Sequence, residues 1–256
     1  MALLRVDNLT HYFGGLRAVH RYNLVLEPRQ IVGLIGPNGA GKTTIFNLLT
    51  GIHRPAAGNI ELDGRNLLGH QPHEIAAMGL GRTFQNMLLW RHMTVLEHVK
   101  MACYSQLGYG ILDAFFGTPR CRREEKRITA RAMHLMETFN VAGYRDQLVT
   151  SLPYGAQRRV EMARAMALNP KVLLLDEPTA GMTPDELNRM IGIIRQIHRE
   201  FNVAILLIEH RLKFVMELCE RIQTLVFGEV IAEGSPAEIQ NNPAVIEAYL
   251  GKEDVT

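Results

Sequence analysis

Apolar residues follow two patterns along this chain, and each pattern predicts a different kind of element. Three short continuous apolar runs, at Ile31–Ile35, 172–175 and 203–208, are typical of strands buried on both faces of a sheet. After Thr183-Pro184-Asp185-Glu186, which can cap and start a helix, apolar residues recur at helical spacing up to Phe201. Strands that alternate with helices predict an α/β fold, with a mainly parallel sheet and helices on both of its faces.

The N-terminal part of the chain also carries strand signals. Residues 3–6 and 22–26 are short strand candidates, and 60–62 followed by Asp63-Gly64 indicates a hairpin turn. These strands precede and follow the apolar run at Ile31–Ile35, so they enlarge the β part of the predicted core.

The middle of the chain has a different, mostly helical pattern. It extends from about 95 to 136, with a break at 104–119 whose glycines and proline predict a loop. That break is unusually apolar for a solvated loop, and the charged stretch after it, 120–127, is typical of a solvated helix face. We expect this region to be a helical subdomain inserted into the α/β core.

Composition narrows the class of protein without identifying it. The chain has 256 residues, 47% of them hydrophobic, which is enough for a large core in one domain or two small ones. The net charge of +2 gives no signal for a nucleic-acid partner. The N-terminus lacks the apolar core of a signal peptide, and the longest apolar runs are too short to span a bilayer. We therefore expect a soluble, cytoplasmic protein whose membrane role, if it has one, comes through a partner.

The three cysteines add no chemistry. Cys103, Cys121 and Cys219 are far apart in sequence and match neither a disulfide framework nor a zinc-binding spacing. Unpaired thiols in a reducing compartment are the expected state.

The nine residues after the first buried run match the phosphate-binding loop pattern G-x-x-x-x-G-K-[ST]. Glycines let the backbone curl so that several N–H groups point at phosphates, and the helix that follows adds its positive end. Lys42 places a point charge on the β- and γ-phosphates, and the Thr43 hydroxyl can ligate magnesium. A chance glycine-rich turn is disfavoured because the motif follows an apolar strand and precedes a predicted helix. The residues are Gly36, Pro37, Asn38, Gly39, Ala40, Gly41, Lys42, Thr43 and Thr44.

Two carboxylates end the strand predicted at 172–175. Asp176 can hold magnesium, directly or through water, and Glu177 can orient or deprotonate the water that attacks a phosphate. Two acids at a strand exit are common, but beside a phosphate-binding loop they predict an ATPase that uses ATP and Mg²⁺.

Further motifs make the chain resemble the ATPases of ABC transporters. Phe84-Gln85 resembles the family's Q-loop, 152–159 its signature motif with a helix expected at 160–168, and Asp176-Glu177-Pro178-Thr179 its strand-end motif. His210, after Ile208-Glu209, resembles the H-loop histidine, and Phe13 falls where the family places an aromatic ring on the adenine. The motifs occur in the family's order over nearly the whole chain.

The resemblance implies a role for each residue. Glu177, His210 and Gln85 would be catalytic, and Thr43, Gln85 and Asp176 would form the metal environment. Tyr154 and Gly155, in the signature motif, would contact ATP bound by a second cassette. The family signature usually has serine where this chain has Pro153, which offers neither a hydroxyl nor an N–H. In the family, the signature of one cassette and the nucleotide bound by the other form a composite site. We therefore expect the composite site that uses Pro153 to be weaker than one that uses a serine.

The family's architecture implies one cassette domain over residues 1–256. The fold would be a P-loop NTPase core with a mainly parallel sheet, an N-terminal antiparallel β subdomain and an inserted helical subdomain. The boundaries would be 1–85 and 160–240 for the nucleotide-binding core, 86–159 for the helical subdomain with its insertion at 104–119, and 241–256 for a C-terminal tail.

Family membership also implies partners. A second ATPase, identical or paralogous, would complete a sandwich dimer, two permease subunits would bind it, and a solute-binding protein would act through them. The chain would then lie on the cytoplasmic face of the inner membrane as a peripheral subunit.

Among these transporters the chain is most similar to the larger ATPase of branched-chain amino-acid uptake systems. The insertion at 104–119 favours the larger over the smaller paralogue, and the end of the chain, from Asn242-Pro243 to Gly251, agrees. Urea, amide and lipopolysaccharide transport remain open, as does a non-transport ABC protein, although those usually carry two cassettes or a long coiled coil. A GTPase would need an Asn-Lys-x-Asp motif, which the sequence lacks.

Overall fold

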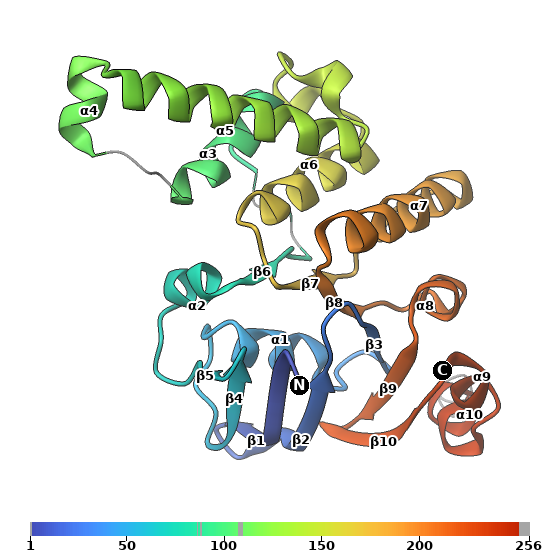
Figure 1. Cartoon of the computed structure of the whole chain (residues 1–256). Coiled ribbons are helices and arrows are strands. Elements are labelled where there is room, and N and C mark those ends of the chain that lie inside the picture. Colours follow the sequence, from blue (N-terminus) through green and yellow to red (C-terminus); the bar gives the residue numbers. More distant parts are fainter. Residues whose placement is uncertain (1, 86, 88, 107–109, 251–256) are drawn as a thin grey trace.

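A six-stranded sheet forms the core of the computed structural model, which describes residues 2–85, 87, 89–106 and 110–250 (Figure 1). Five neighbouring strands are parallel, and the edge strand β10 runs antiparallel to β9. The mainly parallel sheet is therefore confirmed, and the three predicted buried strands are correct to within one residue at each end. The strand order is β10 (Glu229–Gly234), β9 (Arg221–Val226), β3 (Ile31–Ile35), β8 (Ala204–Ile208), β7 (Val172–Asp176) and β6 (Leu80–Arg82).

A second, antiparallel sheet is built by the N-terminal part of the chain. Its order is β2 (Leu16–Leu26), β1 (Leu4–Phe13), β4 (Ala57–Leu62) and β5 (Arg65–Asn66). The turn at Asp63-Gly64, both with positive φ, joins β4 to β5 as predicted. The strand predicted at 3–6 covers only the start of β1, and the one predicted at 22–26 covers only the end of β2. Both predictions were too short because register shifts along β1 break the two-residue alternation on which they relied.

The two faces of the six-stranded sheet are covered differently. Ile31 and Ile35 face a cluster with α7 (Pro184–Phe201) and α8 (Leu212–Leu218), whereas Val32 and Leu34 face α1 (Lys42–Leu49) and the antiparallel sheet. Helices therefore lie on both faces, as expected, but on the second face α1 is joined by the antiparallel sheet. The antiparallel sheet buries its own apolar side against this face, so the apolar residues of the two sheets share one core.

Helix α7 confirms the start predicted from sequence. The Thr183 hydroxyl accepts a hydrogen bond from the Glu186 N–H, the Glu186 carboxylate accepts one from the Thr183 N–H, and Pro184 occupies the first turn. Its apolar stripe is buried except for the partly buried Phe201, and Asn202 ends it in the left-handed region. The remaining helices are α2 (Pro72–Met78), α9 (Pro236–Gln240) and α10 (Pro243–Leu250).

Four helices form a separate layer above the sheets in Figure 1. They are α3 (Val95–Cys103), α4 (Ile111–Phe116), α5 (Pro119–Thr138) and α6 (Tyr154–Ala167). Residues of α3, α5 and α6 share the large core cluster with α7 and one face of the sheet. The charged stretch 120–127 lies mostly exposed on α5, as predicted. Among the described residues, no helix is both long and apolar enough to cross a membrane.

Two predictions within this layer are wrong. The break at 104–119 is not a loop: it holds a 3₁₀ turn at Tyr104–Gln106, the helix α4 and the first residue of α5, while 107–109 lie outside the described residues. Gly117 ends α4 in the left-handed region and Thr118 caps α5, so the loop-like residues act as helix stop and start signals. The helix expected at 160–168 begins six residues earlier, at Tyr154, directly after Pro153.

Candidate functional site

The phosphate-binding loop connects β3 to α1 as predicted, and its glycines are required by shape. Gly36, Gly39 and Gly41 all have φ between 80° and 146°, where side chains are strained. A Cβ at Gly36 would lie 2.0 Å from the Leu225 carbonyl oxygen, and other residues are therefore excluded. The Lys42 ammonium donates to the Gly36 and Pro37 carbonyls, at 2.7 and 3.0 Å, and so lies over its own loop.

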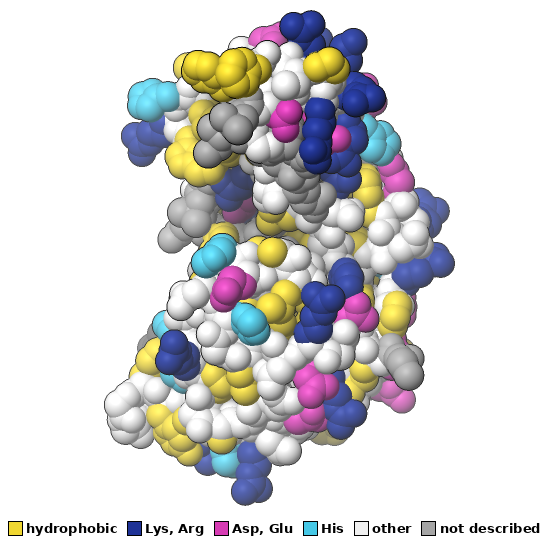
Figure 2. All heavy atoms as spheres, turned by 60° about the vertical axis from the view of Figure 1, so that its left-hand side comes forward, with side chains coloured by type: hydrophobic (Ala, Val, Ile, Leu, Met, Phe, Trp, Pro, Cys, Tyr) yellow, Lys and Arg dark blue, Asp and Glu magenta, His cyan; other side chains and the backbone are white. Residues whose placement is uncertain are grey.

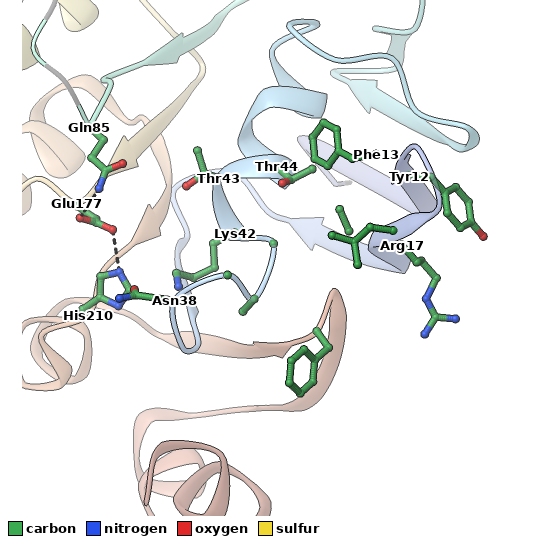
Figure 3. A pocket seen from close by; sticks show the side chains of 16 residues that line it. Tyr12, Phe13, Arg17, Asn38, Lys42, Thr43, Thr44, Gln85, Glu177 and His210 are labelled. Atoms are coloured by element: carbon green, nitrogen blue, oxygen red, sulfur yellow. Dashed lines mark hydrogen bonds and ion pairs between the residues drawn. The ribbon is translucent and has the colours of Figure 1, made fainter. Parts of the chain in front are cut away.

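A cavity of ≈ 830 Å³ opens over this loop (Figure 3). The loop forms one wall with Asn38, Gly39, Ala40, Gly41, Lys42, Thr43 and Thr44. Gln85, Glu177 and His210, which come from three different segments, form a second wall. The structure therefore brings the predicted catalytic residues to the predicted phosphate loop, and the volume suits a ligand of nucleotide size.

The rest of the wall is apolar and aromatic except for Arg17, and sequence reasoning found only part of it. Phe13 lines the cavity, and its ring is nearly perpendicular to those of His11 and His53, at centroid distances of 4.7 and 5.3 Å. Tyr12 and Phe227 were missed, as were three neighbours in the β1–β2 region. The adjacency of Tyr12 to Phe13 was the only available signal, because Phe227 lies in a turn more than 200 residues away. The three neighbours are Leu16, Arg17 and Ala18.

Glu177 is the centre of the polar wall. Its Oε2 accepts a hydrogen bond from Gln85 Nε2 at 3.2 Å, and its Oε1 lies 2.8 Å from His210 Nε2 (Figure 3). The backbone of Glu177 is in the left-handed region, at φ 48°, which costs a residue with a side chain about 1–3 kcal/mol. The surrounding contacts thus hold this carboxylate in a strained but defined position at the edge of the cavity.

Asp176, one residue earlier, is buried beneath this wall and does not line the cavity. Arg82 Nη2 donates to its Oδ2 at 3.0 Å, while Asn47 of α1 and Thr50, which directly follows α1, accept from Nη1 of the same guanidinium. Burial raises the pKa of Asp176, and Arg82 partly opposes that rise. Sequence reasoning missed Arg82, whose partner lies 94 residues away.

Two oxygen atoms of this region, one on Asp176 and one on Thr43, are of the kind that magnesium binds. Asp176 Oδ1 is buried and has no hydrogen-bond partner among the described residues, and the Thr43 hydroxyl lies at the cavity. Mg²⁺ is usually held by one or two carboxylates together with substrate phosphates, not by a cage of protein ligands. The part of the chain that the structure describes has no cluster of three His, Cys, Asp or Glu side chains suited to a metal.

His210 owes its position to its neighbour Glu209, which is buried. Glu209 Oε1 accepts from the Thr179 N–H at 2.9 Å and also from the Thr179 hydroxyl, and its Oε2 accepts from the His210 N–H at 3.0 Å. One carboxylate therefore joins the segment after Glu177 to the segment that carries His210.

The signature residues lie away from this cavity. Tyr154 and Gly155 begin α6 and are not among the residues that line it. Tyr154 packs against Gly181, where an added Cβ would lie 3.3 Å from the tyrosine ring. Pro153 precedes the helix and makes no side-chain capping bond. The expected contact of these residues with nucleotide on a second chain stays a prediction.

Comparison with known proteins decides the family. A family model described as "ABC transporter" matches residues 19–180, which include the phosphate loop, Gln85 and the strand-end acids. The chain belongs to the ABC transporter family. A second model, "Branched-chain amino acid ATP-binding cassette transporter", matches residues 229–255.

This ABC cassette has relatives along its whole length. It is 44% identical to the high-affinity branched-chain amino acid transport ATP-binding protein BraF of Pseudomonas aeruginosa, with 98% of each chain covered. The corresponding protein LivG of Escherichia coli matches at the same identity and coverage. MJ1267, an ATP-binding cassette of an ABC transporter solved in its ADP conformation, superposes with a TM-score of 0.85 at 28% identity, covering 98% of this chain and 99% of that one. The family and fold predicted from the motifs, and the ATPase class with them, are confirmed.

Proposed function

We propose that this ABC ATPase is the ATP-hydrolysing motor subunit of a membrane importer for branched-chain amino acids. The observation that carries the proposal is the position of Glu177: its carboxylate lies between Gln85 and His210, on the wall that faces the phosphate loop. A base at that place serves hydrolysis, because it can orient and deprotonate a water next to the terminal phosphate.

Each residue of the cavity has its own role in binding or hydrolysis. Lys42 and the N–H groups of the loop bind the phosphates, and Phe13 supports the adenine ring. Glu177 accepts the proton of the attacking water, and His210 and Gln85 hold the carboxylate and contact the reacting phosphate. Catalysis by such a site is positioning and charge stabilisation. Thr43, Gln85 and Asp176 would form the environment of Mg²⁺, which when bound neutralises phosphate charge.

A second cassette would complete the nucleotide site. Tyr154 and Gly155 lie outside the cavity, at the start of α6. In a head-to-tail pair, each chain's α6 would reach the nucleotide held by the other, where the helix N-terminus favours an anion. The partner is an identical or a paralogous cassette.

An apolar groove beside the Gln85 segment suits a permease. The groove, of ≈ 370 Å³, lies between α2 and α3 and is lined by Phe84, Trp90 and Met101, the last two about half exposed. Figure 2 is turned toward this side of the molecule, and its left outline is indented between the helical layer and the sheets. A helix on a cytoplasmic loop of a permease would fill the groove and place the cassette on the inner face of the membrane as a peripheral subunit.

Branched-chain amino acids are the favoured cargo because similarity extends over the whole chain, C-terminal segment 229–255 included. The cassette itself would never touch the cargo, which a solute-binding protein would deliver to the two permeases. Urea, short amides and lipopolysaccharide are therefore the alternatives that an experiment must separate.

The test is reconstitution of the cassette, its partner cassette and the two permeases in proteoliposomes. Leucine-loaded binding protein should stimulate ATP hydrolysis and drive leucine uptake, and Lys42→Ala should abolish both. Stimulation by urea or a short amide but not by leucine would contradict the assignment of branched-chain amino acids as the cargo. Failure of the cassette to assemble with any permease would overturn the role in transport.

A further inference from the structure

Arg158 is a fully buried arginine whose hydrogen bonds converge on the catalytic wall. It lies on α6, one turn after the helix begins, and its side chain has no exposed surface. Nη1 donates to the Phe84 carbonyl at 2.5 Å and to Glu161 Oε2 at 2.7 Å. Nη2 donates to the carbonyl of Gln85 at 3.2 Å and to that of Glu177 at 3.1 Å. One guanidinium thus binds the backbone of two of the three proposed catalytic residues.

Glu161 completes this arrangement from the same helix. It is as buried as Arg158, and its Oε1 accepts a hydrogen bond from the Phe84 N–H at 3.0 Å. The peptide groups on both sides of Phe84, directly before Gln85, are therefore held by α6. A buried ion pair by itself contributes little to stability, because desolvation of the two charges offsets their attraction.

The targets of Arg158 distinguish it from an ordinary structural ion pair. Four of its bonds go to carbonyl oxygens that belong to two different segments, those of Phe84 and Gln85 and those of Asp176 and Glu177. The backbone of Glu177 is strained. The Glu177 N–H donates to the Ile208 carbonyl at 2.9 Å, so Arg158 and β8 together hold both ends of that residue. Strained backbone at a site persists only where surrounding contacts over-determine it.

We propose that Arg158, supported by Glu161, is a positioning residue that couples α6 to Gln85 and Glu177. This inference rests on the proposed function, since it assigns Arg158 to the same hydrolytic site. Helix α6 begins with Tyr154 and Gly155, the residues that the proposed pairing would direct at the partner cassette. A displacement of α6 on pairing therefore moves the Gln85 and Glu177 backbones through one side chain, and hydrolysis depends on α6 being in place.

The test separates this role from stability. The double variant Arg158→Met/Glu161→Gln removes both charges while the glutamine oxygen still accepts from the Phe84 N–H. In the assembled transporter we expect unchanged ATP affinity, within about threefold, and kcat at least tenfold lower. Arg158→Lys keeps the charge next to Glu161 but lacks the planar fork that reaches two segments, so we expect an intermediate kcat.

A matched control is Arg131→Met, which removes a partly buried arginine of α5 whose partner is the Asn169 side chain. We expect it to leave kcat unchanged. Wild-type kcat in both the double variant and Arg158→Lys would overturn the coupling, and if the double variant does not fold, Arg158→Lys alone decides. A wild-type transporter without ATP hydrolysis would instead overturn the proposed function, so the two failures are distinguishable.

Discussion

His210 Nε2 lies 2.8 Å from Glu177 Oε1, and the two residues come from the ends of neighbouring parallel strands, β8 and β7. The contact places an imidazole beside the proposed base, and both side chains line the cavity over the phosphate loop. Parallel strands bring their carboxyl ends to one edge of the sheet, and residues 33 positions apart meet there.

Removal of that imidazole should reduce turnover without abolishing binding. We expect His210→Ala to lower kcat about 10²-fold, the usual cost of losing one donor aimed at a reacting group. ATP affinity should change little, because Lys42 and its loop remain. Steady-state ATPase assays and nucleotide titrations would measure both quantities. His134→Ala, which removes an exposed histidine paired with Glu200 on another face, is the control, and equal losses in the two variants would contradict the role of His210.

The aromatic wall predicts how adenine is held. Phe13→Ala should weaken ATP binding about tenfold or more, since stacking of an aromatic ring on a base contributes about 1–3 kcal/mol. Phe13→Tyr should keep most of the affinity. Tyr12→Ala tests the neighbouring ring, and a loss confined to that variant would move the stacking role from Phe13 to Tyr12. Fluorescence titration with ATP is the measurement.

The proline before α6 predicts a weakened composite site. Pro153→Ser supplies a capping hydroxyl and an N–H at a helix start that has no side-chain cap. We expect turnover of the assembled transporter to rise about tenfold, because a hydrogen bond to a charged phosphate contributes about 1.5 kcal/mol. Pro153→Ala separates the N–H from the hydroxyl. Unchanged turnover in Pro153→Ser would contradict the proposal that Pro153 weakens the composite site.

Helix α3 carries a pH-dependent cap. The Thr94 N–H donates to the Glu97 carboxylate at 2.7 Å, and this bond and that from the Thr94 hydroxyl lower the pKa of Glu97 below its ordinary value of 4.5. A lowered carboxyl pKa contributes stability that is present above the unfolded pKa and is lost as pH falls through the folded pKa. Glu97→Gln should therefore lower Tm near pH 7 and match wild type in acid. Glu137→Gln, on the exposed side of α5, is the control, and a Tm difference that persists unchanged in acid would contradict the assignment.

Local patterns predicted the parts of the site that are local in sequence. The loop from Gly36 to Thr44 follows from the spacing of its glycines, and the cap of α7 from Thr183 and Glu186. Glu177 was recognisable because it ends a continuous apolar strand beside a phosphate loop. In each of these cases the residue types, the spacing and the flanking element agree.

The supporting residues could not be predicted, because their partners are remote. Arg82 pairs with Asp176 across 94 residues, and Arg158 binds the carbonyl of a residue 19 positions later in a different element. Arg158 lies in the signature-like segment 152–159 and Arg82 lies shortly before Phe84-Gln85, but neither motif indicates which groups its arginine binds. The long strands β1 and β2 were underestimated for a related reason, since bulges break their alternation.

The most direct test of the account is Glu177→Gln in the complete transporter. Glutamine keeps the shape of the side chain and can still contact Gln85 and His210, but it cannot take a proton from water. We predict ATP binding within about threefold of wild type and hydrolysis reduced at least 10²-fold, the lower end of what a positioned base contributes. Hydrolysis within a few-fold of wild type would contradict the central claim that Glu177 activates the attacking water.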